Sequence, residues 1–139
     1  TDGVGGAYAI DQDTGEEEWC PAVMATVTDA TGAGDVFASG LVLGCLAGWP
    51  LEQRLKFASL TASLAVQQFG GSLAAPGWGD IADWWRCLRR RATAGDLRAA
   101  HISRDYGFLE DLIPRHQVHS VRRAEATFAN HSDLPNKRQ

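Results

Sequence analysis

The chain has 139 residues, of which 45% are apolar and 22% charged, and its formal net charge is −4. These values fit one domain or part of a larger one. The sequence has no secretion signal and no apolar run of the roughly 18 residues that span a bilayer, which excludes a membrane protein. Its three cysteines are widely spaced without a Cys-x-x-Cys pair, which argues against a disulfide framework or a cysteine zinc site and leaves a reducing cytoplasm as the expected compartment.

The first predicted element is a β-hairpin. Residues 6–11 have a strand-like composition, Asp13-Thr14-Gly15 has the chemistry of a turn, and residues 17–23 supply the returning strand. The chain begins at Thr1, and Met24 is its single methionine. Because a structured pattern starts at once, we expect a fragment cut within a domain.

Three helices are predicted after the hairpin. The first covers residues 35–47 and ends at Gly48 and Pro50; we expect it to be buried on a broad face made of Val36, Phe37, Leu41, Val42, Cys45 and Leu46. The second starts at Leu51 and closes at Gly70-Gly71, with apolar positions Leu55, Ala58, Ala62, Ala65 and Phe69. Asp80 is predicted to cap a third, which carries Ile81, Trp84, Trp85 and Leu88. Strands followed by long buried helices indicate an α/β layer architecture.

Composition changes near Arg91. Residues 1–85 carry a net charge of −9 and residues 86–139 one of +5, and all four histidines lie after residue 100. Leu109, Leu112 and Ile113 predict one short amphipathic helix that ends at Pro114, but the apolar residues of this part are sparse. We therefore predict a domain over 1–92 and a basic, histidine-containing tail over 93–139 that is weakly structured or disordered, with fast hydrogen exchange throughout 115–139.

The segment that carries chemistry is Asp29-Ala30-Thr31-Gly32-Ala33-Gly34-Asp35-Val36-Phe37, which lies between the hairpin and the first long helix. Gly32, Ala33 and Gly34 have little or no side chain, so their backbone N–H groups can approach an anion where the helix dipole also favours negative charge. Asp35 falls in the first turn, where it stays ionised and can accept a proton from a hydroxyl. These features suit phosphoryl transfer.

This segment resembles the C-terminal signature of the ribokinase-like (PfkB) carbohydrate kinases, [Asp/Asn]-[Thr/Ala]-x-Gly-Ala-Gly-Asp-x-Phe, at every defined position. The first six residues resemble the family's Thr-x-Gly-x-x-Gly nucleotide loop, and residues 57–71 resemble its helix and glycine turn near the adenine. The resemblance covers residues 1 to about 85. It implies a three-layer α/β/α fold, of which only the C-terminal part, a β-hairpin plus long buried helices, is present.

The resemblance also implies roles for single residues. Asp35 would be the catalytic base, and Gly32, Ala33 and Gly34 the anion hole for the transferring phosphate. The nucleotide would contact Thr1, Gly3, Gly6, Ser59 and Gly70, Ser59 standing where the family often has an Asn or His beside the adenine. Asp29, Thr31 and Ala65 match positions that hold a monovalent cation in some members, with Gln68 and Ala74 as weaker matches. ATP and Mg²⁺ are thus the implied cofactors, and K⁺ is an optional one.

Our functional prediction is an ATP-dependent phosphotransferase that acts on an alcohol group of a sugar or related carbohydrate. The family's sugar-contacting residues come from the part that precedes Thr1, so the sugar stays open and we expect little kinase activity from the 139-residue chain alone. We predict a small carbohydrate as the partner, with neither nucleic acid nor membrane, and leave a homodimer of the full-length protein open. The alternative is a non-catalytic nucleotide-binding or interaction remnant of such a kinase.

Other motifs favour structural interpretations. The chain has no complete P-loop, Gly32-Ala33-Gly34 lacks the third glycine of a dinucleotide fingerprint, and the Asp13-Thr14-Gly15 triplet of an aspartic protease is followed by three glutamates, as in a solvated turn. His116 and His119, with His101 and His131 nearby, lack the spacing of a three-ligand zinc site. Arg89-Arg90-Arg91 and Arg122-Arg123 lack the interleaved aromatics of a nucleic-acid interface, and Trp84 and Trp85 are predicted to pack.

Overall fold

The predicted hairpin is confirmed in the computed structural model, which describes residues 1–116, 118 and 119. After a 3₁₀ turn, η1 (Gly3–Gly5), strand β1 (Ala7–Ile10) pairs antiparallel with β2 (Glu17–Cys20), and Ala7 lies opposite Cys20. The turn between the strands closes on Asp11, whose carboxylate accepts the backbone N–H groups of Asp13 at 3.0 Å and Thr14 at 3.3 Å. These two bonds hold the pKa of Asp11 below its usual value. Asp13 and Thr14 therefore belong to an exposed turn.

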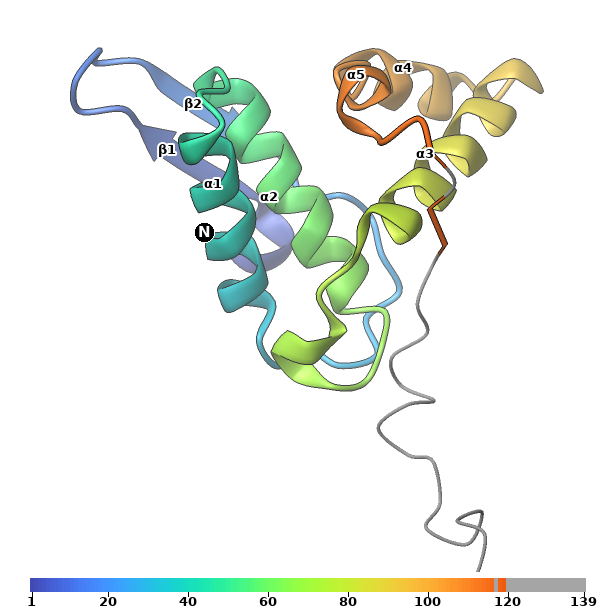
Figure 1. Cartoon of the computed structure of the whole chain (residues 1–139), viewed down its shortest axis with the longest axis horizontal. Helices are drawn as coiled ribbons and strands as arrows, with labels where there is room; N and C mark the ends of the chain where they lie inside the picture. Colours follow the sequence, from blue (N-terminus) through green and yellow to red (C-terminus); the bar gives the residue numbers. More distant parts are fainter. Residues whose placement is uncertain (117, 120–139) are drawn as a thin grey trace, which may run out of the picture.

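Helices α1 (Ala33–Leu46) and α2 (Leu51–Ala65) lie side by side, and the hairpin packs against α2 (Figure 1). Glycines make the contact between the helices: a Cβ atom at Gly40 would lie 2.8 Å from the Thr61 hydroxyl oxygen and 3.0 Å from the Ala58 Cα. The broad apolar face predicted for α1 is therefore wrong. The helix buries Val36, Gly40 and Gly44, while Val42 is 55% and Leu46 83% exposed.

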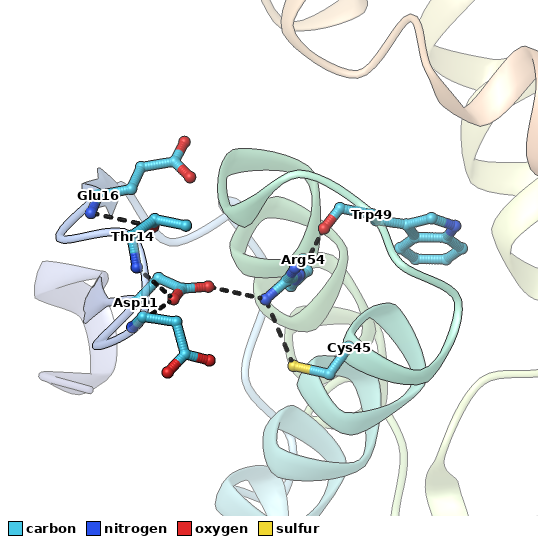
Figure 2. A network of polar contacts seen from close by, with 7 residues as sticks. Asp11, Thr14, Glu16, Cys45, Trp49 and Arg54 are labelled. Carbon is cyan, nitrogen blue, oxygen red and sulfur yellow. Dashed lines mark hydrogen bonds and ion pairs between the residues drawn. The ribbon is translucent and has the colours of Figure 1, made fainter.

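Arg54 of α2 connects the hairpin turn to the end of α1 (Figure 2). Its guanidinium donates to the Trp49 carbonyl, to Asp11 Oδ2 at 3.4 Å and to the Cys45 sulfur at 3.8 Å. The Arg54 and Asp11 side chains are 22% and 19% exposed, so this ion pair is partly shielded from solvent. The arginine thus fixes the distal end of the hairpin relative to both helices.

A second group of helices follows a 3₁₀ turn, η2 (Gly71–Ala74). It consists of α3 (Trp78–Thr93), α4 (Leu97–Asp105) and α5 (Leu109–Leu112), at the upper right of Figure 1. Helix α3 begins two residues before Asp80, because the Asp80 carboxylate reaches back and accepts the Gly77 N–H at 2.8 Å. Asp96 caps α4 by accepting the Ala99 N–H at 3.0 Å. The main core joins this group to α2; its buried members are Phe57, Leu60, Ile81, Trp85, Leu88, Ala99, Tyr106 and Leu109.

The short helix predicted before Pro114 is present as α5, whereas α4 lies where we expected a weakly structured segment. Ala99, Tyr106 and Leu109 are too scattered in sequence to form one apolar stripe, yet the turns between α3, α4 and α5 bring them onto one core. The Tyr106 ring lies edge-on to Trp84 at 5.3 Å between centroids, and its hydroxyl donates to the Lys56 carbonyl of α2. The exchange behaviour that we predict for 115–139 concerns residues that lie almost entirely outside the described ones, as do Arg122, Arg123 and His131.

The packing of α5 leads to a stability prediction. Leu109 is 0% exposed, so Leu109→Ala should lower the free energy of unfolding by about 2–4 kcal/mol through lost burial and a residual cavity. Leu97, at the start of α4, is 85% exposed and supplies the matched control, since Leu97→Ala should change stability by less than about 0.5 kcal/mol. Urea unfolding of both variants measures the difference. Equal, small effects would show that α5 does not belong to the core.

Candidate functional site

The glycine loop at the start of the chain is tied to the end of β2. The Asp2 N–H donates to the Gly6 carbonyl and the Gly5 N–H to the Asp2 carbonyl, both at 2.8 Å. Gly6 has φ +103°, and a Cβ atom there would lie 2.3 Å from the Cys20 carbonyl oxygen. Only glycine fits this close approach in that conformation. The loop therefore packs closely against the end of β2.

The motif at residues 29–37 forms the start of α1. Gly32, the N-cap residue, has φ +74° and accepts the first helical bond from the Val36 N–H at 3.0 Å. The Ala33 N–H donates to the Ala30 carbonyl at 3.2 Å. The N–H groups of Gly34 and Asp35 lie in the first turn, where an α-helix supplies no acceptor for them. This turn can therefore present backbone donors and the positive end of the helix dipole to an anion.

A cavity of about 510 Å³ connects the glycine loop with the start of α1 and with α2. It brings together six of the site residues predicted from the sequence: Thr1, Gly3, Gly6, Ala33, Gly34 and Ser59. Sequence reasoning missed one whole wall, made by the segment between β2 and α1, with Ala22, Val23, Met24, Ala25 and Val27. The one indication in the sequence is position. This apolar segment directly connects the second strand of the hairpin to the motif at residues 29–37.

Asp35 is exposed in the first turn of α1 and is not itself a lining residue of the cavity, although Gly34 before it is. The Ser39 hydroxyl donates to the backbone carbonyl of Asp35 at 2.8 Å and not to its carboxylate. Gly32 also lies outside the lining, because it faces the turn at residues 70–72: a Cβ atom on it would lie 2.4 Å from the Ser72 nitrogen.

The residues expected near a cation lie beside that same turn. Asp29 Oδ1 accepts the Thr31 N–H at 2.9 Å, and the Thr31 hydroxyl together with the backbone of Thr31, Gly70 and Gly71 holds the pKa of the Asp29 carboxyl below its usual value. Ala65 is buried in the last turn of α2, and its carbonyl accepts the Gln68 N–H at 3.1 Å. Asp29, Thr31 and Gly70 thus lie together, and the Asp29 N–H donates to the carbonyl of Val66, just after α2, at 3.1 Å.

The lowered pKa of Asp29 predicts a pH-dependent contribution to stability. A carboxyl whose pKa is lower in the folded state stabilises the fold above the ordinary aspartate pKa of about 3.9, and this contribution disappears as the pH falls through the folded value. Asp29→Asn should therefore lower the melting temperature at pH 7 and lower it less at pH 2. Thermal melts of both proteins across this range test the sign. A difference that is equal at both pH values would assign the effect to packing.

The other chemical motifs show structural partners. Arg89 pairs with Glu110 at 3.1 Å and lies over the Trp85 ring, while Arg91 pairs with Asp96 at 2.6 Å, so two members of the arginine cluster join helices to one another.

In the part of the chain that the structure describes, no three His, Cys, Asp or Glu side chains gather to hold a metal ion. No helix within that part is both long and apolar enough to cross a membrane.

Comparison with known proteins gives matches to one family of enzymes. The profile of the pfkB family carbohydrate kinases matches residues 1–77. A 5-dehydro-2-deoxygluconokinase of Bacillus velezensis is 37% identical over 79 residues, which are 57% of this chain and 24% of that protein. The Arabidopsis thaliana ribokinase solved with ribose and ATP superposes with a TM-score of 0.54 at 29% identity, over 58% of this chain and 26% of the ribokinase.

A ribokinase of Thermotoga maritima superposes with a TM-score of 0.53 at 21% identity, over 60% of this chain and 28% of that one, and this match bears on the fold alone. The predicted ribokinase-like α/β fold is confirmed, with about 60% of the chain covered by these structures. The chain spans about a quarter of the length of these relatives.

Proposed function

The chain belongs to the pfkB family of carbohydrate kinases, and on that premise we propose that it carries the ATP site and the catalytic base of a phosphotransferase that acts on an alcohol group of a sugar. The observation that carries the proposal is the cavity itself. It is bordered by the glycine loop, by the N-terminal turn of α1 and by Ser59 of α2, so one space connects a backbone anion site with an apolar wall.

In the proposed reaction, the N–H groups at the start of α1 stabilise the charge on the γ-phosphoryl group during transfer. The sugar hydroxyl oxygen forms the new bond to phosphorus, the bond to the β-phosphate oxygen breaks, and the hydroxyl proton passes to the Asp35 carboxylate. An ordinary aspartate is adequate because the transition state is loose and the proton leaves late. Mg²⁺ would enter with the nucleotide and offset its phosphate charge.

The proposed sugar substrate and the proposed cation rest on separate observations. A relative acts on 5-dehydro-2-deoxygluconate by its name and a structural neighbour was solved with ribose, which supports a small sugar or sugar acid as the phosphate acceptor. Asp29, Thr31 and Ala65 are the residues that we assign to an optional K⁺, supported by the fixed orientation of the Asp29 carboxylate beside Gly70. We propose residues 1–92 as the kinase part and 93–139 as an appendage to it; of the appendage, α4 and α5 pack on the main core.

Nucleotide binding to the 139-residue chain tests the anion site. Calorimetric titration should show affinity that falls from MgATP to MgADP to AMP, as phosphates are removed. Gly34→Glu places a carboxylate at the proposed phosphate position, where a Cβ atom meets nothing within 4 Å, so the fold tolerates it and ATP affinity should drop about tenfold or more. Ala38→Glu, exposed on the next turn of α1, is the control and should bind as the wild type does.

Two outcomes would contradict this proposal in different ways. Unchanged ATP affinity in Gly34→Glu would show that the phosphates do not bind at the start of α1. ATP binding without sugar phosphorylation by the longest natural polypeptide that carries this sequence would favour the alternative, a nucleotide-binding remnant.

A further inference from the structure

The lining of the cavity has no charged side chain within the described residues, although the ligand proposed for it is a polyanion. The first lysine or arginine in the sequence is Arg54, so neither the glycine loop nor the first turn of α1 has a basic side chain. The first two basic residues are already paired, Arg54 with Asp11 and Lys56 with Glu52. A further cation for this ligand would therefore come from a later part of the chain.

Arg98 of α4 brings such a cation to the wall of the cavity. One of its guanidinium nitrogens, Nη1, lies 3.3 Å from the Met24 sulfur. Met24 belongs to the cavity lining and is 79% exposed, and Arg98 is exposed as well. The contact between them thus lies at the solvent-exposed border of the apolar wall.

The guanidinium of Arg98 keeps its charge and most of its donors available. A thioether sulfur is a weak acceptor, whereas a guanidinium has five N–H donors. Three arginines of α3 each pair with a carboxylate, namely Arg86, Arg89 and Arg91. Among the residues that the structure describes, no Asp or Glu side chain pairs with Arg98. An anion would therefore be a stronger partner for this group than the sulfur that it contacts.

Both sides of the contact are anchored in the main core. Ala99, the residue after Arg98, is 1% exposed in that core, and Val23, the residue before Met24, packs against the same cluster. The Asp96 cap fixes the first turn of α4 as well. The main chain at Arg98 therefore stays beside the wall, while its long side chain can turn from the sulfur toward a ligand.

We propose that Arg98 is a ligand-binding residue of the cavity: its guanidinium leaves the Met24 sulfur and pairs with a negatively charged group of the bound ligand. The fitting class is a ligand with phosphate groups, such as a nucleoside triphosphate. This inference deepens the proposed function and rests on it, because it assumes that such a ligand occupies the cavity. Residue 98 lies beyond residues 1–77, which the family profile matches, so the appendage would supply this cation.

The test measures the dissociation constant of MgATP for the 139-residue chain by calorimetric titration, at about 50 mM and about 500 mM NaCl. Arg98→Gln removes the charge and keeps a long polar side chain, so affinity should fall about fivefold at low salt, near the upper end for an exposed ion pair. At high salt the loss should shrink to about twofold or less, because screening already weakens the wild-type interaction.

Two further variants separate the charge of Arg98 from other effects. Arg98→Lys keeps the charge and should bind MgATP within about twofold of the wild type. Arg104→Gln makes the same charge change at an exposed position near the end of α4 and is the matched control, which should bind as the wild type does. Urea unfolding should give all of these proteins the same stability, because both arginines are exposed.

Unchanged MgATP affinity in Arg98→Gln at low salt would overturn the role of Arg98. A loss of the same size at both salt concentrations would assign the effect to packing on Met24 and would overturn it as well, as would an equal loss in Arg104→Gln. In these cases MgATP binding by the wild type would still support the proposed function. Absence of MgATP binding by the wild-type chain would overturn both.

Discussion

Asp35→Asn is expected to lower the rate of phosphoryl transfer by about a hundredfold to ten-thousandfold, the range that a positioned general base contributes. The amide has nearly the shape of the carboxylate but cannot accept the hydroxyl proton. The backbone donors of the first α1 turn stay in place, because the side chain of Asp35 is exposed and the first helical bond is made by Val36. The dissociation constant of MgATP should therefore change less than about threefold.

The measurement is kcat with the cognate sugar and the ATP dissociation constant, both in the longest natural polypeptide that carries this sequence. Asp13→Asn makes the same chemical change in the exposed hairpin turn and should leave both quantities unchanged. A kcat for Asp35→Asn within threefold of the wild type would remove Asp35 from the role of base. An equal loss in Asp13→Asn would point to a general effect of charge.

The order of elements in the first part of the chain could be predicted because local signals agree there. Turn chemistry at Asp13-Thr14-Gly15 marks the hairpin, and the structure confirms its two strands. The helical face of α1 could not be predicted in the same way, because periodicity counts apolar side chains and gives no weight to glycine. The contact with α2 depends on the absence of side chains at Gly40 and Gly44, so the apolar residues Val42 and Leu46 face outward.

The candidate site could likewise be predicted only in part. Glycines and an aspartate at fixed spacing identify the start of α1, and the structure places Ala33 and Gly34 in one cavity with the glycine loop and Ser59. The apolar wall around Met24 is indicated in the sequence only by its place between the hairpin and the motif. The contact between Cys20 and Ser59 carries no local signal, because the two residues come from separate elements. Residues 97–113 illustrate the same limit, since Tyr106 and Leu109 reach the core only through two turns.

Two glycines at the ends of α1 offer a controlled experiment on the motif. Gly32 at the N-cap and Gly48 after the last turn have nearly the same backbone conformation, φ +74° and φ +70°. Alanine in this conformation costs about 1–2 kcal/mol at either position. A Cβ atom at Gly48 meets nothing within 4 Å, whereas one at Gly32 would lie 2.4 Å from the Ser72 nitrogen and 2.8 Å from the Gly71 carbonyl carbon. The two sites thus differ in space and share their backbone strain.

Gly48→Ala is therefore expected to lower the free energy of unfolding by about 1–2 kcal/mol, and Gly32→Ala by about 3–5 kcal/mol, because backbone atoms must move to admit the extra carbon. Any movement of the turn at residues 70–72 also disturbs the Asp29 carboxylate and the first turn of α1, so MgATP affinity should fall in Gly32→Ala and stay at the wild-type value in Gly48→Ala. Urea unfolding and calorimetric titration measure the two effects. Equal losses of stability in both variants would show that Gly32 is not in close contact with the turn at residues 70–72. The shape of the anion site would then depend on α1 alone.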